Sequence, residues 1–334
     1  MPRLLAAPDK FRGTLSAQQA ALAIAEAAEE RGWEPDLAPV SDGGEGFLEV
    51  FASRLAARRR SRVCGPLGEP VEAEWLLCPP EGGGQQPWAV VESAQAIGLW
   101  LCGGPEGNDA LRAGTTGVGQ LVAEAARAGA GQVIVGLGGS ATTDGGLGAV
   151  EALGWSGPAS AGLVVACDVQ ASFQEAAALF SPQKGASPAQ VGLLERRLSR
   201  VARLYEQRLG RDVRHLPGGG AAGGLGGGLA ALGAYLVPGF ELVARRLGLA
   251  ERVAQADLVV TGEGYVDRQS FTGKAVGGVV ALARAAGVPF LVVAGDGEAG
   301  LPVGYVSLAR SFGPGRARED AAGCLRAAVA GRLG

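Results

Sequence analysis

The sequence has 334 residues, which is long enough for two domains with a large apolar core. Its 30 basic and 33 acidic residues give a net charge of −3, so no field of one sign is available to hold nucleic acid or an anionic membrane. Five scattered cysteines, without a C-x-x-C pair and with a single histidine, argue against a zinc site or a disulfide framework.

The start of the chain, "MPRLLAAPDK", lacks the regions of a signal peptide, and no apolar run approaches the roughly 18 residues of a membrane span. We therefore expect a cytoplasmic protein. The one basic cluster, at residues 58–62, is interpreted as a solvated helix end. The sequence does not determine the oligomeric state and leaves a homodimer open.

The N-terminal part alternates strands with helices. "RLLAAPD" (3–9) predicts a buried strand, residues 17–32 a helix capped by Thr14 or Ser16, residues 35–42 a second strand and residues 43–56 a second helix. The C-terminal part repeats the alternation, with strands at 256–262, 288–295 and 304–310 and helices at 273–287 and 319–333. This alternation is typical of a parallel sheet covered by helices, and both chain ends can share one sheet.

The middle of the chain has a different pattern. Residues 71–78 and 87–101 predict antiparallel strands, and residues 115–146 predict a helix, a strand and a glycine-rich turn. The glycine-rich stretch 218–232 is either a flexible linker or the start of a helix. We predict an α/β protein with a discontinuous Rossmann-like domain (1–65 and 251–334), a mixed-sheet α/β domain inserted at 66–250, and an active site in the cleft.

Standard nucleotide-binding fingerprints are weak in this chain. "GLGGSA" (136–141) and "GDGEAG" (295–300) follow predicted strands, but neither is followed directly by the helix that dinucleotide binding requires. "GYVDRQSFTGKA" (264–275) has the wrong spacing for a Walker A loop and has Ala275 where Ser or Thr should hold magnesium. The sequence therefore excludes a P-loop protein.

Four loops that follow predicted strands join glycines to a carboxylate: residues 7–13, 40–46, 138–146 and 262–274. They contain Asp9, Asp42, Asp144 and Asp267, and the chain's only three lysines, Lys10, Lys184 and Lys274, also lie in glycine-bearing turns. Aspartate favours turns for local reasons, and the lysines can be chance survivors of an arginine-rich composition. Phosphoryl transfer needs the same groups, so these loops indicate a small-molecule kinase or phosphatase.

Long motifs along the chain resemble the bacterial glycerate kinase family of the glycerate 2-kinase type. They include "APDKFRGTLSAQQAA", "APVSDGGEGF", "GLGGSATTDGG", "PQKGA" and "ADLVVTGEGYVDRQSFTGKA". The resemblance implies ATP-dependent phosphorylation of (R)-glycerate at its 2-hydroxyl, with Mg²⁺ and a cleft between two α/β domains. Phosphorylation of the 3-hydroxyl, a kinase for another small hydroxy acid, and a non-catalytic sensor of glycerate or nucleotide remain alternatives.

Residues that match the family motifs are the candidate site residues. Asp267 or Asp42 is expected to act as the base, and Lys274 to contact phosphate or the glycerate carboxylate. Asp144 and Asp168 are candidates for magnesium. The resemblance implies a further set that binds substrate or phosphate: Asp9, Lys10, Arg12, Ser16, Gly43, Gly44, Glu45, Gly138, Gly139, Ser140, Thr142, Lys184, Gly262, Glu263 and Gln269.

Three departures from the family pattern affect how far these family roles can be assigned to residues of this chain. The segment between "EALG" and "ACDV" is shortened to "WSGPASAGLVV", which suggests the loss of a surface element. After "ACDV" the chain reads "QASFQEAAALF" in place of an Asn-Pro and glycine-rich run, which puts a ligand contact from this loop in doubt. Tyr265 and Arg268 stand at positions that are small, basic or glycine in the family, where they can tune the fit of the acceptor.

Overall fold

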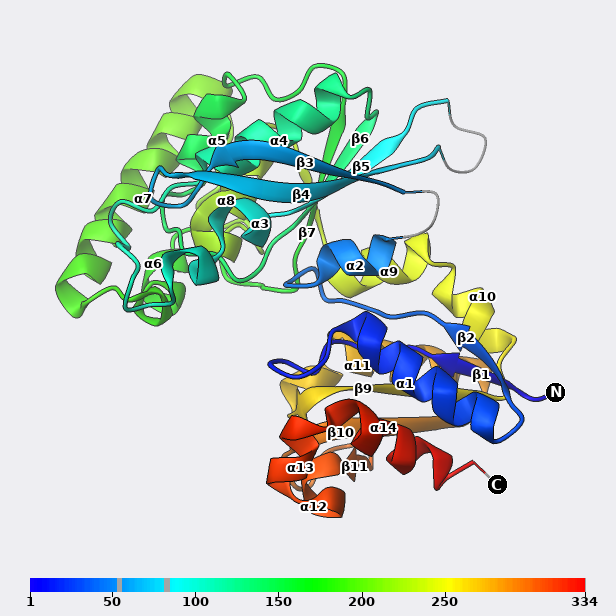
Figure 1. The fold of residues 1–334 in the computed structure, drawn as a ribbon. Coiled ribbons are helices and arrows are strands. Elements are labelled where there is room, and N and C mark those ends of the chain that lie inside the picture. Colours follow the sequence, from blue (N-terminus) through cyan, green and yellow to red (C-terminus); the bar gives the residue numbers. More distant parts are fainter. Residues whose placement is uncertain (53–55, 81–84, 334) are drawn as a thin grey trace. The chain divides into compact units, whose positions relative to one another are not determined.

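A computed structural model describes residues 1–52, 56–80 and 85–333 of the chain. These residues form two compact units, one made of residues 1–42 and 238–334 and the other of residues 43–237 (Figure 1). Each unit contains one sheet with helices packed against it. The predicted fold class is confirmed, because the chain ends share a parallel sheet and the inserted part forms a mixed sheet.

The change from one unit to the other falls earlier in the chain than the predicted boundaries at 65/66 and 250/251. Strand β3 (Ala57–Cys64) pairs antiparallel with β4 (Pro70–Cys78), so residues before 65 belong to the inserted sheet. Helices α9 (Gly239–Arg246) and α10 (Leu249–Ala254) pack with α11 (Ala275–Ala286) of the terminal unit. Strand pairing moves the first junction and helix packing moves the second, and sequence patterns show neither.

The terminal unit has five parallel strands in the order β11-β10-β9-β1-β2. Their bounds are Arg3–Ala6 for β1, Glu34–Leu37 for β2, Leu258–Val266 for β9, Phe290–Gly297 for β10 and Val306–Ser307 for β11. Besides α9 to α11, its helices are α1 (Ala17–Glu30), the 3₁₀ turn η3 (Gln269–Phe271), α12 (Leu308–Phe312), α13 (Pro314–Glu319) and α14 (Ala321–Ala330).

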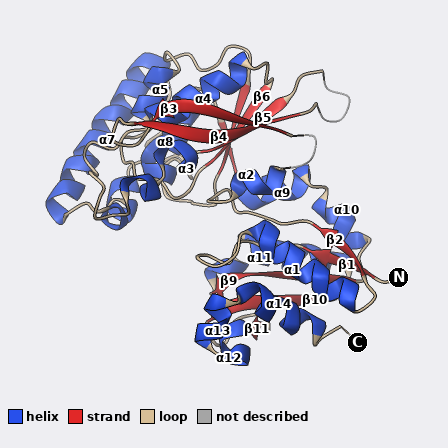
Figure 2. Cartoon of the chain, in the orientation of Figure 1, coloured by secondary structure: helices blue, strands red, loops and turns tan. Residues whose placement is uncertain are grey.

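Side-chain alternation along β10 divides the core of this unit between the two faces of its sheet. Val293 packs with Ile24 of α1 and Leu325 of α14, whereas Val292 and Ala294, on either side of Val293 along the strand, pack with Val276 of α11. Helices α1 and α14 accordingly lie on one face and α11 on the other (Figure 2). We call these the α1 face and the α11 face.

The inserted unit has six strands in the order β3-β4-β5-β6-β7-β8. The β4–β5 pair is antiparallel, as predicted, the β3–β4 pair is antiparallel as well, and the pairs from β5 to β8 are parallel. The remaining bounds are β5 Trp88–Glu92, β6 Gln132–Gly136, β7 Gly162–Ala166, β8 Tyr235–Val237, α2 Phe47–Phe51, α3 Ala94–Ile97, η1 Leu99–Cys102, α4 Thr116–Arg127, α5 Leu147–Ala152, α6 Ala176–Phe180, η2 Pro182–Lys184, α7 Pro188–Leu209 and α8 Ala221–Ala231.

Two local predictions in this unit are corrected, and one open alternative is decided. Residues 58–62 lie in the edge strand β3 and not at a helix end, and the Arg58 guanidinium pairs with Glu49 and Glu74. The second half of the predicted strand 87–101 folds into α3 and η1. Of the two alternatives for the glycine-rich stretch 218–232, a linker or the start of a helix, the helix is observed: the stretch contains α8, whose Leu225 is fully buried. Among the described residues no helix is long and apolar enough to cross a membrane.

Candidate functional site

Three carboxylates of the terminal unit interact in the segments at and after the carboxyl ends of β1, β9 and the edge strand β2, and we call Asp9, Asp42 and Glu263 the acidic set. The N–H of Asp9 donates to the Gly262 carbonyl at 2.9 Å, and the N–H of Gly264 donates to the Lys10 carbonyl at 3.3 Å. These bonds continue the β1–β9 pairing beyond β1 and bring Asp9 beside Glu263. The sequence named all three residues, and the structure shows that they form one electrostatic group.

Asp9 is a buried carboxylate, with 6% of its surface exposed. Burial, reinforced by repulsion from Asp42, raises the pKa of Asp9 to about 6, although the charges of Lys10 and Lys274 and the N–H of Lys10 oppose the rise. The Lys10 N–H donates to Asp9 Oδ1 at 2.6 Å, and Lys10 Nζ lies 4.0 Å from the same oxygen. Asp9 therefore changes protonation near neutral pH.

Glu263 combines a raised pKa with an oxygen that has no partner. Burial is the largest cause of the rise in its pKa to about 7, Asp9 and Asp42 add to it, and Ser270 and Lys274 oppose it. Its Oε1 atom is buried without a hydrogen bond in the described structure. A carboxylate with a pKa near the working pH and a free acceptor oxygen is suited to accept a proton.

Lys274 and Asp267 lie at the other end of the same loop. Lys274 is the N-terminal cap residue of α11, and its charge acts on Asp9, Glu263 and Asp267. Asp267 Oδ1 accepts hydrogen bonds from the Ser270 N–H at 2.8 Å and the Ser270 hydroxyl at 3.1 Å. Partial burial raises the pKa of Asp267, but these bonds and Lys274 outweigh it, so the pKa falls below its usual value. These contacts are those of a residue that shapes a loop.

The other candidates of this unit have mixed surroundings. Ser16 caps α1, because its hydroxyl accepts from the Gln19 N–H at 3.1 Å while the Gln19 side chain accepts from the Ser16 N–H at 2.9 Å. Gly262 allows close strand approach, since a Cβ there would lie 1.7 Å from the Val293 carbonyl oxygen. Arg12 and Gln269 are exposed on the loops that carry Asp9 and Asp267.

In the inserted unit, Lys184 anchors the glycine-rich loop that follows β6. Its Nζ donates to Ser140 Oγ at 3.0 Å and to the Thr142 carbonyl at 2.6 Å, and the side chain is 4% exposed. Burial lowers the pKa of Lys184 to about 7, against the attraction of Asp144. The Thr142 hydroxyl itself donates to the Ala222 carbonyl at 3.4 Å. Lys184 thus holds the backbone of the predicted phosphate loop.

The same region contains polar side-chain atoms that the sequence did not reveal. Asn108 Nδ2 donates to the Ala141 carbonyl at 3.0 Å and the Lys184 carbonyl at 2.8 Å. Asn108 Oδ1, Ser93 Oγ and Thr143 Oγ1 are buried and make no hydrogen bond to the described residues. Asn108 is the chain's only asparagine, which is the one signal that could have singled it out.

Backbone segments of the inserted unit approach each other closely at several of its glycines, where a Cβ atom would not fit. A Cβ at Gly138 would lie 2.5 Å from the Gly44 Cα, and one at Gly43 would lie 2.9 Å from the Ala166 carbonyl oxygen. Gly43 has a φ of +93° and Gly139 a φ of +61°. Glu45 is exposed beside them, and the sequence missed buried Glu92, which accepts from the Gly46 and Leu48 N–H groups at the start of α2.

Asp144 has a structural environment. Its carboxylate accepts from the N–H and hydroxyl of Thr115 at 2.9 and 2.8 Å, and from the N–H groups of Gly146 and Gly148 at 3.0 and 3.2 Å. Asp168 follows β7 and is partly buried. Within residues 1–52, 56–80 and 85–333, no group of three or more acidic, histidine or cysteine side chains could hold a metal ion. Magnesium ligation by Asp144 and Asp168 stays a prediction, and these contacts do not favour it for Asp144.

Comparison with known proteins supports the family resemblance over nearly the whole chain. A family model described as the glycerate kinase family matches residues 4–162 and 156–312. A glycerate kinase of Halalkalibacterium halodurans is 39% identical over 337 residues, covering 89% of this chain and 86% of the relative. The glycerate 2-kinase of Escherichia coli strain K12 is 38% identical over 335 residues, covering 88% and 85%.

A solved structure agrees with these sequence relatives. The crystal structure of a Salmonella typhimurium LT2 protein, provisionally named glycerate kinase 2, matches with a TM-score of 0.82 at 32% identity and covers 99% of this chain and 97% of that protein. Sequence and fold therefore lead to the same assignment. The chain belongs to the glycerate kinase family.

Proposed function

We propose that the protein transfers the γ-phosphoryl group of ATP to the 2-hydroxyl of (R)-glycerate and releases 2-phosphoglycerate and ADP. Membership of the glycerate kinase family supports ATP and glycerate as substrates. The name of the Escherichia coli relative, glycerate 2-kinase, supports the position of transfer. The observation that carries the chemistry is Glu263, a carboxylate with a pKa near 7 and an unpartnered buried oxygen.

We assign Glu263 as the general base. As the glycerate 2-hydroxyl oxygen bonds to the γ-phosphorus, the bond from that phosphorus to the β,γ-bridging oxygen breaks, ADP leaves, and the hydroxyl proton passes to Glu263. Lys274 and Lys10, whose charges act on the acidic set, stabilise the charge on the transferring group. To Asp267, one of the two bases expected from the sequence, we assign a positioning role, which its hydrogen bonds from Ser270 support.

Magnesium fits this site only together with the nucleotide. The described residues contain no cluster of three or more metal-ligating side chains. Mg²⁺ commonly takes one or two protein carboxylates and completes its shell with substrate phosphates and water. Asp9 and Asp42 would supply these carboxylates, and the ion would neutralise phosphate charge.

The 2-position is tested by incubating the protein with (R)-glycerate, ATP and Mg²⁺ and adding enolase without a mutase. We expect phosphoenolpyruvate to form directly, because 2-phosphoglycerate is the substrate of enolase. Release of ADP with no phosphoenolpyruvate until phosphoglycerate mutase is added would contradict the 2-position and indicate 3-phosphoglycerate. Thermal stabilisation by glycerate with no ADP release would contradict catalysis and indicate a sensor.

A further inference from the structure

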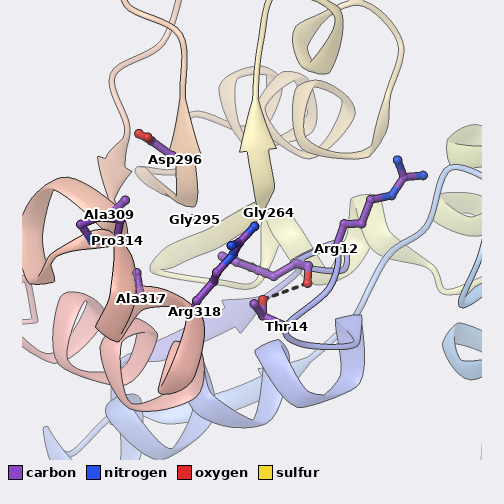
Figure 3. Close-up of a pocket in the computed structure, with 10 residues that line it drawn as sticks. Arg12, Thr14, Gly264, Gly295, Asp296, Ala309, Pro314, Ala317 and Arg318 are labelled. Atoms are coloured by element: carbon purple, nitrogen blue, oxygen red, sulfur yellow. Dashed lines mark hydrogen bonds between the residues drawn. The ribbon is translucent and has the colours of Figure 1, made fainter.

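A pocket of about 280 Å³ opens on the terminal unit beside the acidic set. It is lined by the loop after β1, the ends of β9 and β10, and the short helices α12 and α13 (Figure 3). In the sheet β1 and β9 are neighbours. The sheet continues beyond β1 to β2 and beyond β9 to β10 and β11, so the strand order reverses between β1 and β9. Ligands of open parallel sheets bind outside the carboxyl ends of the strands at such a reversal of strand order.

The walls of the pocket combine an apolar side with a polar rim. Gly264 and Gly295 leave its floor without side chains, and Ala309, Pro314 and Ala317 line the side formed by α12 and α13. This floor includes the start of the stretch "GDGEAG", which failed the dinucleotide fingerprint because no helix follows it directly. A flat ring can lie against such surfaces, because the glycines and alanines add little bulk of their own.

Polar groups border this apolar wall. In Figure 3 the Arg318 side chain extends from α13 toward Gly264, whereas Arg12 extends away from α13. Asp296 Oδ1 accepts from the Ser307 hydroxyl at 2.9 Å and lies 3.4 Å from Arg310. A carboxylate has about four acceptor sites, so Asp296 can accept further hydrogen bonds from ligand hydroxyl groups.

The chain connects this pocket directly to the proposed base. Glu263 pairs in register with Ala294, which packs on the α11 face, so the Glu263 carboxylate lies on that face. Gly264 and Gly295 follow these residues and lie on the α1 face, where α12 and α13 close the pocket. A ligand in the pocket would have to extend past the ends of the strands to meet the acidic set and its lysines.

We propose that this pocket binds the purine nucleoside part of ATP, with the triphosphate directed toward Lys10 and Lys274. This inference rests on the proposed kinase function. Small ligand pockets of roughly 300 Å³ suit a molecule of nucleoside size, and the apolar wall matches a purine ring. Glycerate, which has almost no apolar surface, would leave that wall uncovered. Arg318 contacts the nucleotide, and Asp296 accepts from its ribose hydroxyl groups.

The test compares Ala317→Trp, which fills the pocket from α13, with Ala281→Trp, which adds the same bulk to an exposed position on α11. Binding of ADP is measured by calorimetry without turnover, and the KM values of ATP and glycerate are measured separately. We expect Ala317→Trp to weaken ADP binding at least tenfold and to raise the KM of ATP, while the KM of glycerate stays within about twofold. Ala281→Trp should bind ADP as the unaltered protein does.

Arg318→Ala is a second variant that leaves the volume of the core unchanged, and we expect it to weaken ADP binding about tenfold. Unaltered ADP affinity in both pocket variants would overturn the inference, as would a rise in the KM of glycerate alone, which would make this the acceptor pocket. ADP binding that is lost in Ala317→Trp, in a protein that phosphorylates no glycerate, would support the pocket and contradict the proposed function. Intact folding is checked by the circular dichroism of each variant.

Discussion

Replacement of Glu263 by glutamine tests whether the buried carboxylate of the proposed base destabilises the fold when it is ionised. The pKa of Glu263 rises from 4.5 to about 7 in the folded protein, and one unit corresponds to about 1.4 kcal/mol. Ionised Glu263 therefore lowers the free energy of unfolding by about 3 kcal/mol above pH 7. Because the folded state binds the proton more tightly, stability is lost as the pH rises from about 4.5 to about 7. Glutamine stays neutral and removes this loss.

The assay is urea unfolding of Glu263→Gln and the unaltered protein at pH 5 and pH 8. We expect the advantage of the variant to grow by about 2 kcal/mol between the two pH values. Glu29→Gln, an exposed change on α1 of the same unit, is the matched control and should show no such growth. An advantage of Glu263→Gln that is the same at both pH values would refute the claim that burial of an ionised Glu263 destabilises the fold.

Four further substitutions separate catalytic from structural roles. At pH 7.5 we expect Glu263→Gln to lower kcat at least 100-fold and Asp267→Asn to lower it less, and the reverse order in coupled ADP release would restore Asp267 as the base. Lys274→Ala should lower kcat/KM at least 100-fold with circular dichroism unchanged, and activity near that of the unaltered protein would exclude its role at phosphate. Ser16→Ala should lose about 1 kcal/mol in urea unfolding through its helix cap, whereas a raised KM without loss of stability would favour the ligand contact. Lys184→Met should lower kcat/KM at least tenfold by releasing the Thr142 carbonyl, and unchanged kinetics would show that the loop keeps its shape without it.

The repeating strand–helix pattern at both chain ends was sufficient to predict the parallel sheet, because period-2 and period-3.6 patterns carry that information. The helix cap at Ser16 was likewise readable, since Ser16 and Gln19 form a capping box. Residues 58–62 were misassigned because the charges of an edge strand resemble those of a solvated helix. The sequence alone could not show which strands pair or which helices pack together, and these contacts decide where the units begin.

The candidate site residues also divide into those that the sequence could predict and those that it could not. Motif matching named Glu263 among the binding residues and left the base open between Asp267 and Asp42, because it could not assess burial. In the folded chain Asp267 receives two hydrogen bonds from Ser270, whereas Glu263 keeps an unpartnered oxygen. Asp296 and Arg318 were missed because their shared pocket depends on α12 and α13 lying beside the ends of β9 and β10. A single sequence does not show which distant residues come together in one pocket.

Both units contain buried ionisable groups that lower the free energy of unfolding, and this effect depends on pH in opposite ways in the two units. In the terminal unit, burial raises the pKa of Asp9 and Glu263, so their cost is greatest above pH 7. In the inserted unit, burial lowers the pKa of Lys184 from 10.5 to about 7, so its cost is greatest below pH 7 and disappears as the pH approaches 10.5. Near neutral pH and without ligand, the burial of these groups therefore destabilises both units in part. An anionic ligand that charges Lys184 would recover this energy in the inserted unit, and a cation or a donated proton that satisfies Glu263 would recover it in the terminal unit. The buried ionisable groups therefore give each unit a preference for charged ligands that uncharged loops would lack.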